Sequence, residues 1–398
     1  MEKKRILFAM PFLDEGGAEH ALVNLLNHLP KERYDIDLLL FSKTGMFLRD
    51  VPEWVNVLDT PPGLYEAYNS VRGRKGGPHR WSMVFRRYFW TAVCRFRAKG
   101  NINLSRQLRW EYSYKKSIPP LQGTYDIAVG YIDGEILYYI VDKVNAKRKI
   151  GRISNDYRSS GWNAVLDKPY YSALDAIISV SESSAEIFSG VFPNLRDRCT
   201  VIHNLISPED IRRRAEAFTP NDMKNDVPAI LSIGRLTEQK GYDMAIDAMA
   251  ALKKKGKRCR FYIMGTGAEE KNLKHQRDSL GLTDEVIFLG QKQNPYPYLK
   301  AADIILQSSR WEGKSNVLDE AKVLCKPIVS TAYPTLGDQI HQGEGLVVEL
   351  SAQGIADGLE KMLDQPQLRK SFEDYLGSCH FGNEELLSKY IRVLEGSN

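Results

Sequence analysis

The sequence predicts an α/β protein made of two doubly wound domains that face a cleft, and three observations support this prediction. The chain has 398 residues, which is enough for two domains of ordinary size. Short apolar runs typical of buried parallel strands alternate with amphipathic helical segments in both halves. Between the halves, residues 206–226 are charged and poor in large apolar side chains, which is typical of a helix followed by a linker.

The first half is predicted to begin with a strand over 5–10, a glycine loop and a helix from Ala18. A strand over 37–41 completes this βαβ unit, the unit from which parallel sheets are built. Gly16 and Gly17 in the loop would let a substrate approach the backbone closely, although an ordinary tight turn would use two glycines as well. Later strands are expected over 125–131, 149–153, 175–180 and 199–202.

A loop with two cations follows the first predicted strand of the second half, AILSIGRL. Arg235 and Lys240 lie in this loop, next to Gly234, and can neutralise a diphosphate; the alternative is two solvated surface charges. Gly265 and Gly267 follow the next strand but do not complete the dinucleotide fingerprint GxGxxG. Strands of this half are expected over 261–264, 286–290, 303–307 and 345–348.

The stretch 307–330, QSSRWEGKSNVLDEAKVLCKPIVS, is predicted to form a loop, a helix and a short buried strand. Ser315 and Asn316 are suitable N-cap residues, and a loop that enters a helix N-terminus presents backbone N–H groups to a phosphate. Glu312 in the loop and Glu320 in the helix can accept hydrogen bonds from the paired hydroxyls of a sugar or ribose. Alternatively, Glu312 only complements the helix dipole and Glu320 is solvated.

The sequence EGKSNVLDE, followed by AKVLCKPIVS, resembles the signature of the retaining nucleotide-sugar glycosyltransferases of family four. Those enzymes have the GT-B architecture, two Rossmann-like domains that face a cleft. The resemblance implies that Glu312 contacts the sugar of the nucleotide sugar and that Glu320 contacts its ribose. It further implies that the distal phosphate is held by the backbone amides of Gly313, Lys314, Ser315, Asn316 and Val317.

Other motifs extend this resemblance to most of the expected nucleotide-sugar site. SIGRLTEQKG is similar to the family's diphosphate loop, so Arg235 and Lys240 would stabilise the departing diphosphate, with Gly234 and Gly267 in the same site. The nucleotide base would meet the backbone at Gln291. GGAE is similar to the glycine loop of the first domain, so Gly16 and Gly17 would face the phosphates and the acceptor.

One position departs from the family pattern. The strand over 149–153 often ends, in family members, in a histidine near the reacting sugar, whereas Ser154 stands there in this chain. Asn155 and Asp156 follow it, and we assign these three residues to the acceptor side of the site.

Residues 72–116 carry thirteen Lys or Arg and a single acid, Glu111, although the whole chain has a net charge of only +5. Aromatic residues are interleaved, and Phe85, Phe89 and Val93 have helical spacing. Such a basic amphipathic helix suits an anionic membrane surface or an anionic or lipid-phosphate acceptor. Nucleic acid is a third option, but no recognised nucleic-acid motif accompanies the charge, so we do not expect it. The plain alternative is a solvated face above a buried aromatic stripe.

The remaining composition limits cofactors and location. The five cysteines form no CxxC pair and the histidines show no metal-ligand pattern, so we expect free thiols, a cytoplasmic protein, no cofactor and no metal. A peripheral position on the inner face of the cell membrane is compatible with the basic segment. The expected domains are 1–205, including the basic segment about 72–116 and completed by a C-terminal helix at about 381–398, and 206–380.

The combined expectation is a retaining hexosyl- or N-acetylhexosaminyltransferase. It would move a sugar from a nucleotide sugar, UDP favoured over GDP, onto a cell-surface glycan, a lipid-linked glycan or an anionic polymer. Glu312, Arg235 and Lys240 would carry the reaction. The alternatives are a sugar-nucleotide epimerase of the same fold and a glycosyltransferase-like partner subunit that has lost catalysis, for which Ser154 is the hint.

Overall fold

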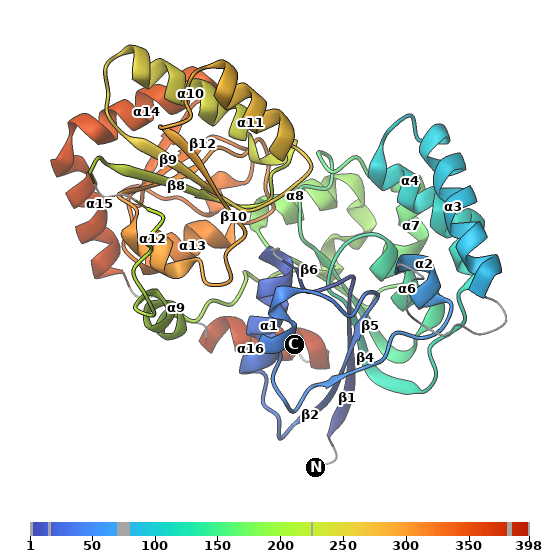
Figure 1. Cartoon of the computed structure of the whole chain (residues 1–398). Coiled ribbons are helices and arrows are strands. Elements are labelled where there is room, and N and C mark those ends of the chain that lie inside the picture. The colour runs from blue at the N-terminus through green and yellow to red at the C-terminus, as the bar shows by residue number, and fades with distance from the viewer. Residues whose placement is uncertain (1–2, 15–16, 70–79, 224–225, 380–383, 397–398) are drawn as a thin grey trace. The chain divides into compact units, whose positions relative to one another are not determined.

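The computed structural model describes residues 3–14, 17–69, 80–223, 226–379 and 384–396. Gly16 and residues 72–79 of the basic segment therefore lie outside the described residues. The chain forms two compact units (Figure 1): unit 1 comprises Met1–Leu205 with Glu384–Asn398, and unit 2 comprises Ile206–Asn383. All five cysteines are free thiols, as predicted.

Unit 1 is built on a seven-stranded sheet with the order β3-β2-β1-β4-β5-β6-β7, in which every neighbouring pair is parallel. β3, with two residues, was not predicted, because so short a segment has no measurable periodicity. The strands are β1 (Lys4–Met10), β2 (Tyr34–Leu40), β3 (Asn56–Val57), β4 (Thr124–Gly130), β5 (Asn145–Ile153), β6 (Ala176–Ser179) and β7 (Cys199–Val201).

Helices cover both faces of this sheet, because alternate residues of a strand point to opposite sides. Ile6 and Phe8 of β1 pack with α1 (Gly17–His28) and with α16 (Glu384–Glu395), the helix that returns to this unit at the end of the chain. Leu7 packs on the opposite face. The other helices are α2 (Leu64–Tyr68), α3 (Arg80–Arg97), α4 (Ile102–Arg109), α5 (Lys115–Ser117), α6 (Glu135–Lys143), α7 (Ala164–Ser172) and α8 (Glu182–Val191).

Unit 2 is built on a second parallel sheet, with six strands in the order β10-β9-β8-β11-β12-β13. Its strands are β8 (Ala229–Ile233), β9 (Arg260–Met264), β10 (Val286–Gly290), β11 (Ile304–Gln307), β12 (Ile328–Thr331) and β13 (Leu346–Val348). Its helices are α9 (Pro208–Ala215), α10 (Tyr242–Lys254), α11 (Glu270–Ser279), α12 (Tyr296–Ala301), α13 (Asn316–Val323), α14 (Ala352–Asp364) and α15 (Pro366–Ser378).

The strand order of unit 2 determines where a ligand fits. The chain adds β9 and β10 on one side of β8 and then crosses to add β11, β12 and β13 on the other side. The direction of winding therefore changes between β8 and β11. In doubly wound sheets, ligands bind beyond the carboxyl ends of the strands at such a switch point. The loops after β8 and β11 are the two that carry the predicted diphosphate residues and Glu312.

Candidate functional site in the second unit

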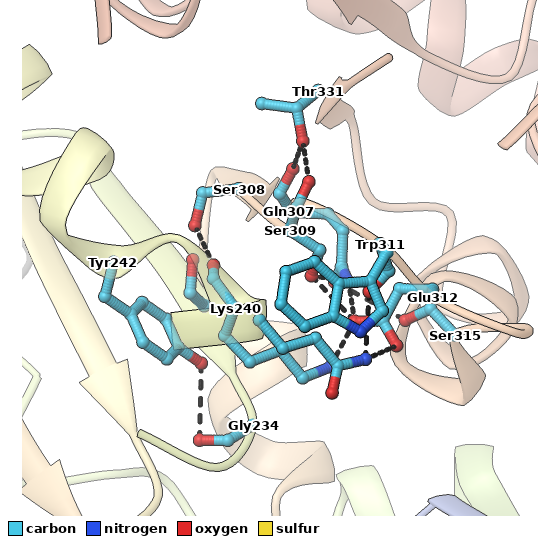
Figure 2. Close-up of polar contacts among 12 residues, drawn as sticks. Gly234, Lys240, Tyr242, Gln307, Ser308, Ser309, Trp311, Glu312, Ser315 and Thr331 are labelled. Carbon is cyan, nitrogen blue, oxygen red and sulfur yellow. Dashed lines mark hydrogen bonds and ion pairs between the residues drawn. The ribbon is translucent and has the colours of Figure 1, made fainter. Parts of the chain in front are cut away.

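Glu312 is the centre of a polar cluster formed by the loops after β8 and β11 (Figure 2). It is 6% exposed, and four side chains donate to its carboxylate. Lys240 Nζ lies 2.6 Å from Oε1, which also accepts from Ser309 Oγ at 2.7 Å and from Gln307 Nε2 at 3.1 Å. Gln239 Nε2 donates to Oε2 at 3.2 Å. A carboxylate with so many donors is held in one orientation.

The backbone of the two loops is joined so that Lys240 reaches Glu312. Ser308 Oγ donates to the carbonyl oxygen of Lys240 at 2.8 Å, and the amide of Arg310 donates to the carbonyl of Gln239 at 2.7 Å. The guanidinium of Arg310 also binds both carboxylate oxygens of Asp243, at 2.8 and 2.6 Å, and this hydrogen bonding lowers the pKa of Asp243. The ion pair Lys240–Glu312 thus connects two loops that are also connected by these hydrogen bonds.

The two glycines of the incomplete GxGxxG motif are packing residues here. A Cβ atom on Gly265 would lie 2.1 Å from the carbonyl oxygen of Gly234, and one on Gly267 would lie 2.3 Å from that of Leu236. The loop after β9 therefore lies directly against the loop after β8. Its contacts include a hydrogen bond of 2.8 Å from the Leu236 amide to the Thr266 carbonyl. Gly267 therefore packs against the predicted diphosphate loop, and its assignment to the nucleotide-sugar site remains a prediction.

Arg235 differs from Lys240 in its surroundings. Arg235 is exposed, and no ion pair among the described residues involves it. Lys240 is largely buried and its charge is balanced by Glu312. Of the two predicted diphosphate cations, Arg235 is the one whose charge is available to an incoming anion without breaking a contact. The alternative of two solvated surface charges is wrong for Lys240.

The start of α13 holds the other predicted contacts. Ser315 is the N-cap residue but makes no side-chain cap, and its amide donates to Gln339 Oε1 at 2.9 Å, so this amide already has a partner. Lys314 forms a largely buried ion pair of 3.1 Å with Asp319. Glu320 is 5% exposed and accepts a long hydrogen bond of 3.4 Å from Tyr296, so the alternative that it is solvated is wrong. Gln291 is exposed directly after β10.

In unit 1, the residues assigned to the acceptor side have structural partners. The Ser154 hydroxyl accepts from Arg152 Nη1 at 2.8 Å, and the Ser154 amide donates to Asp133 Oδ2 at 3.1 Å. Asp156 closes a local turn, because its carboxylate accepts from the amides of Arg158 and Ser159 at 2.8 and 3.2 Å. Asn155 is partly exposed. The assignment of these three residues to an acceptor remains a prediction.

Asp133 lies at the switch point of the first sheet, directly after β4, and sequence reasoning did not single it out. Burial raises the pKa of its carboxyl to about 6, although hydrogen bonds from the Ser154 amide and the Tyr171 hydroxyl act to lower it. Its position two residues after the predicted strand over 125–131 was the available signal. Gln239, Gln307 and Ser309 were missed as well, although Gln307 ends a predicted strand and Ser309 lies two residues after it.

The raised pKa of Asp133 predicts a pH dependence of stability. In the unfolded chain, the pKa of an aspartate carboxyl is about 3.9. Between roughly pH 4 and 6, Asp133 is therefore protonated more often in the folded protein than in the unfolded chain. The free energy of unfolding should therefore fall by about 2–3 kcal/mol as the pH rises through this window. Urea unfolding across the window, compared between the native chain and Asp133→Asn, isolates the contribution. If the free energy of unfolding changes with pH in the same way in the native chain and in Asp133→Asn, the raised pKa of Asp133 does not contribute to the pH dependence.

The two doubly wound parallel sheets define a protein of the GT-B class. The crystal structure of Anabaena HepE in complex with UDP and glucose aligns with 99% of this chain and 100% of that one, with a TM-score of 0.69 and 16% identity. Residues 213–376 of this chain match the family model described as glycosyl transferases group 1. These findings bear out the resemblance that the stretch around Glu312 carries, and they confirm the predicted fold class.

Two curated relatives show how far the similarity extends. An uncharacterized glycosyltransferase from Haemophilus influenzae is 28% identical over 403 residues, covering 98% of this chain and all of that protein. A protein from Campylobacter jejuni is 30% identical over 228 residues, covering 55% of this chain and 60% of that protein. Its name is N-acetylgalactosamine-N,N'-diacetylbacillosaminyl-diphospho-undecaprenol 4-alpha-N-acetylgalactosaminyltransferase. Several of the curated relatives are matched over about half to two thirds of their own length.

Proposed function

We propose that this protein is a retaining glycosyltransferase that transfers a hexosyl or N-acetylhexosaminyl group from a nucleotide sugar to a cell-surface glycan. The observation that carries the proposal is the Lys240–Glu312 pair, held by two joined loops at the switch point of unit 2, with the exposed Arg235 in the same loop as Lys240. A buried carboxylate suits sugar hydroxyls, and a free guanidinium suits a diphosphate. No metal is needed where side chains neutralise the diphosphate.

In the proposed reaction, the bond between the anomeric carbon and the diphosphate oxygen breaks, and the acceptor oxygen attacks the same face of the sugar. The acceptor proton passes to the departing diphosphate, so no protein nucleophile is required. Arg235 and the N-terminus of α13 stabilise the charge that develops on the leaving group. Glu312 orients the sugar through a hydroxyl that replaces one of its present side-chain donors, and Glu320 accepts hydrogen bonds from the ribose.

UDP is the proposed nucleotide and a lipid-linked or polymeric glycan the proposed acceptor. The solved structures of the same fold include complexes of Anabaena HepE with UDP and with UDP-glucose. The names of the relatives include a diphospho-undecaprenol-linked sugar and lipopolysaccharide core biosynthesis. These names support the substrate classes proposed here for this chain and leave the individual sugar open to measurement.

The test is nucleotide release from UDP-glucose, UDP-N-acetylglucosamine, UDP-galactose and GDP-mannose, each with lipid-linked and polymeric glycan acceptors. We expect acceptor-dependent UDP release and a product whose anomeric configuration, observed by NMR as it first forms, equals that of the nucleotide sugar. Interconversion of nucleotide sugars without an acceptor would instead identify an epimerase. Binding of a nucleotide sugar without any turnover would identify an inactive partner subunit.

The role of Arg235 predicts a selective loss of activity. In Arg235→Ala, turnover should fall by roughly tenfold to a hundredfold, because one cation facing the leaving group is lost from the transition state. Stability should stay unchanged, since the exposed side chain has no ion pair among the described residues. Arg258→Ala, which removes another exposed arginine of unit 2, is the control. Equal turnover in the two variants would refute the role of Arg235.

A further inference from the structure

Helix α3 (Arg80–Arg97) has two apolar faces, and only one of them is packed. Met83 and Cys94 are buried, and so is Ala98 directly after the helix. Successive residues turn by about 100°, and this spacing places a row of aromatic side chains on the opposite side. We call this row the α3 stripe, and its members with their exposed fractions are Trp81 (73%), Phe85 (69%), Tyr88 (66%), Phe89 (48%) and Phe96 (87%).

The stripe is continuous along the helix and faces away from the core of unit 1. The rings of Phe85 and Phe89 are stacked, with centroids 5.8 Å apart and planes 13° from parallel. The packed side of the helix lies against α4, next to which α3 is drawn in Figure 1. A single exposed aromatic residue is ordinary, but a contiguous exposed apolar row marks an interaction surface. The alternative considered from the sequence, a solvated face above a buried aromatic stripe, is therefore wrong for these residues.

Cations lie on both sides of the stripe. α3 contains five arginines and no acidic residue. By the helical turn, Arg95 lies along one edge of the stripe, whereas Arg86 and Arg97 lie along the other. All three are exposed, and no ion pair among the described residues involves them. Arg97 also lies over the ring of Tyr112, 5.3 Å from its centroid. An aromatic row between guanidinium groups whose charges no described carboxylate balances suits a partner that is apolar inside and anionic at its surface.

We propose that α3 docks on an anionic membrane surface, with its axis parallel to the bilayer. The aromatic rings of the stripe would sit at the level of the lipid headgroups, and the flanking guanidinium groups would bind lipid phosphates. A bilayer matches the stripe along its whole length, and the positive charge matches anionic lipids. In the part of the chain that the structure describes, no helix has the length and apolarity needed to cross a bilayer, so docking would be peripheral.

The experiment is flotation of the full chain with vesicles of phosphatidylcholine alone or of phosphatidylcholine with phosphatidylglycerol. We expect binding to the anionic vesicles, weak binding to the neutral ones, and loss of binding at high salt. In the variant Arg86→Gln/Arg95→Gln/Arg97→Gln, affinity should fall on the order of tenfold or more. The matched control, Lys254→Gln/Arg258→Gln/Lys271→Gln, removes three exposed cations of unit 2 and should bind as the native chain does.

A second variant, Trp81→Ser/Phe85→Ser/Phe89→Ser, tests the aromatic row separately. It should lose binding to anionic vesicles while its melting temperature stays the same, because the replaced side chains are exposed. Binding that ignores lipid charge and salt, or that persists in both α3 variants, would overturn the proposal. So would a dimer of the native chain that the aromatic variant abolishes, since the stripe would then join two copies. Flotation needs no turnover, so its result is independent of the proposed reaction.

Discussion

Replacing Lys240 with methionine should reduce turnover by on the order of a hundredfold to a thousandfold. Lys240 Nζ lies 2.6 Å from Glu312 Oε1, and both side chains are largely shielded from water. Without the lysine, the carboxylate keeps its neutral donors but loses its counter-charge. The diphosphate would then have to approach an uncompensated buried anion, which costs binding energy as well as transition-state stabilisation.

A double variant separates these two effects. Lys240→Met should weaken binding of UDP, measured by calorimetry, and lower kcat. In Lys240→Met/Glu312→Gln, the buried anion is absent, so UDP affinity should return toward the native value while kcat stays low, because the residue that orients the sugar is changed. Lys255→Met is the control, since it removes the lysine of an exposed ion pair with Glu360 of the same length, 2.6 Å. If UDP affinity is the same in the single and the double variant, Lys240 does not act by balancing Glu312.

The pattern of buried strands made much of the fold predictable. Residues 6–10 form an apolar run because β1 is covered on both faces, and the same holds for residues 304–306 of β11. The loops that follow these strands were located correctly, since parallel strands must end at one edge of the sheet. The two-residue strand β3 had too little sequence to be detected.

The arrangement around Glu312 was less predictable. Gln239 and Glu312 are far apart in sequence, and they meet because the loops after β8 and β11 are joined through Ser308 and Arg310. Helical periodicity likewise predicted an amphipathic α3 but could not show which of its two apolar faces is packed. The packed face carries Met83 and Cys94 and, directly after the helix, Ala98, and all three are buried.

The glycine beside Lys240 should tolerate a side chain poorly. Gly241 has a φ of 62°, and a Cβ atom there would lie 2.1 Å from the carbonyl oxygen of Ser308. The backbone of one loop must therefore move away from the other. We expect Gly241→Ala to lower the free energy of unfolding by about 3–5 kcal/mol, from left-handed backbone strain and from overpacking together.

Gly281 provides a matched control for this prediction. Its φ is 65°, nearly the same as that of Gly241, but no atom lies within 4 Å of its hypothetical Cβ. Gly281→Ala should cost only about 1 kcal/mol, because it carries the backbone strain without the clash. Urea unfolding measures both costs, and UDP calorimetry should show lost affinity in Gly241→Ala alone, since separating the loops withdraws Lys240 from Glu312. Equal costs at the two positions would mean that the loops after β8 and β11 are not in close contact, and the Lys240–Glu312 pair would then lack the support that the proposed reaction requires.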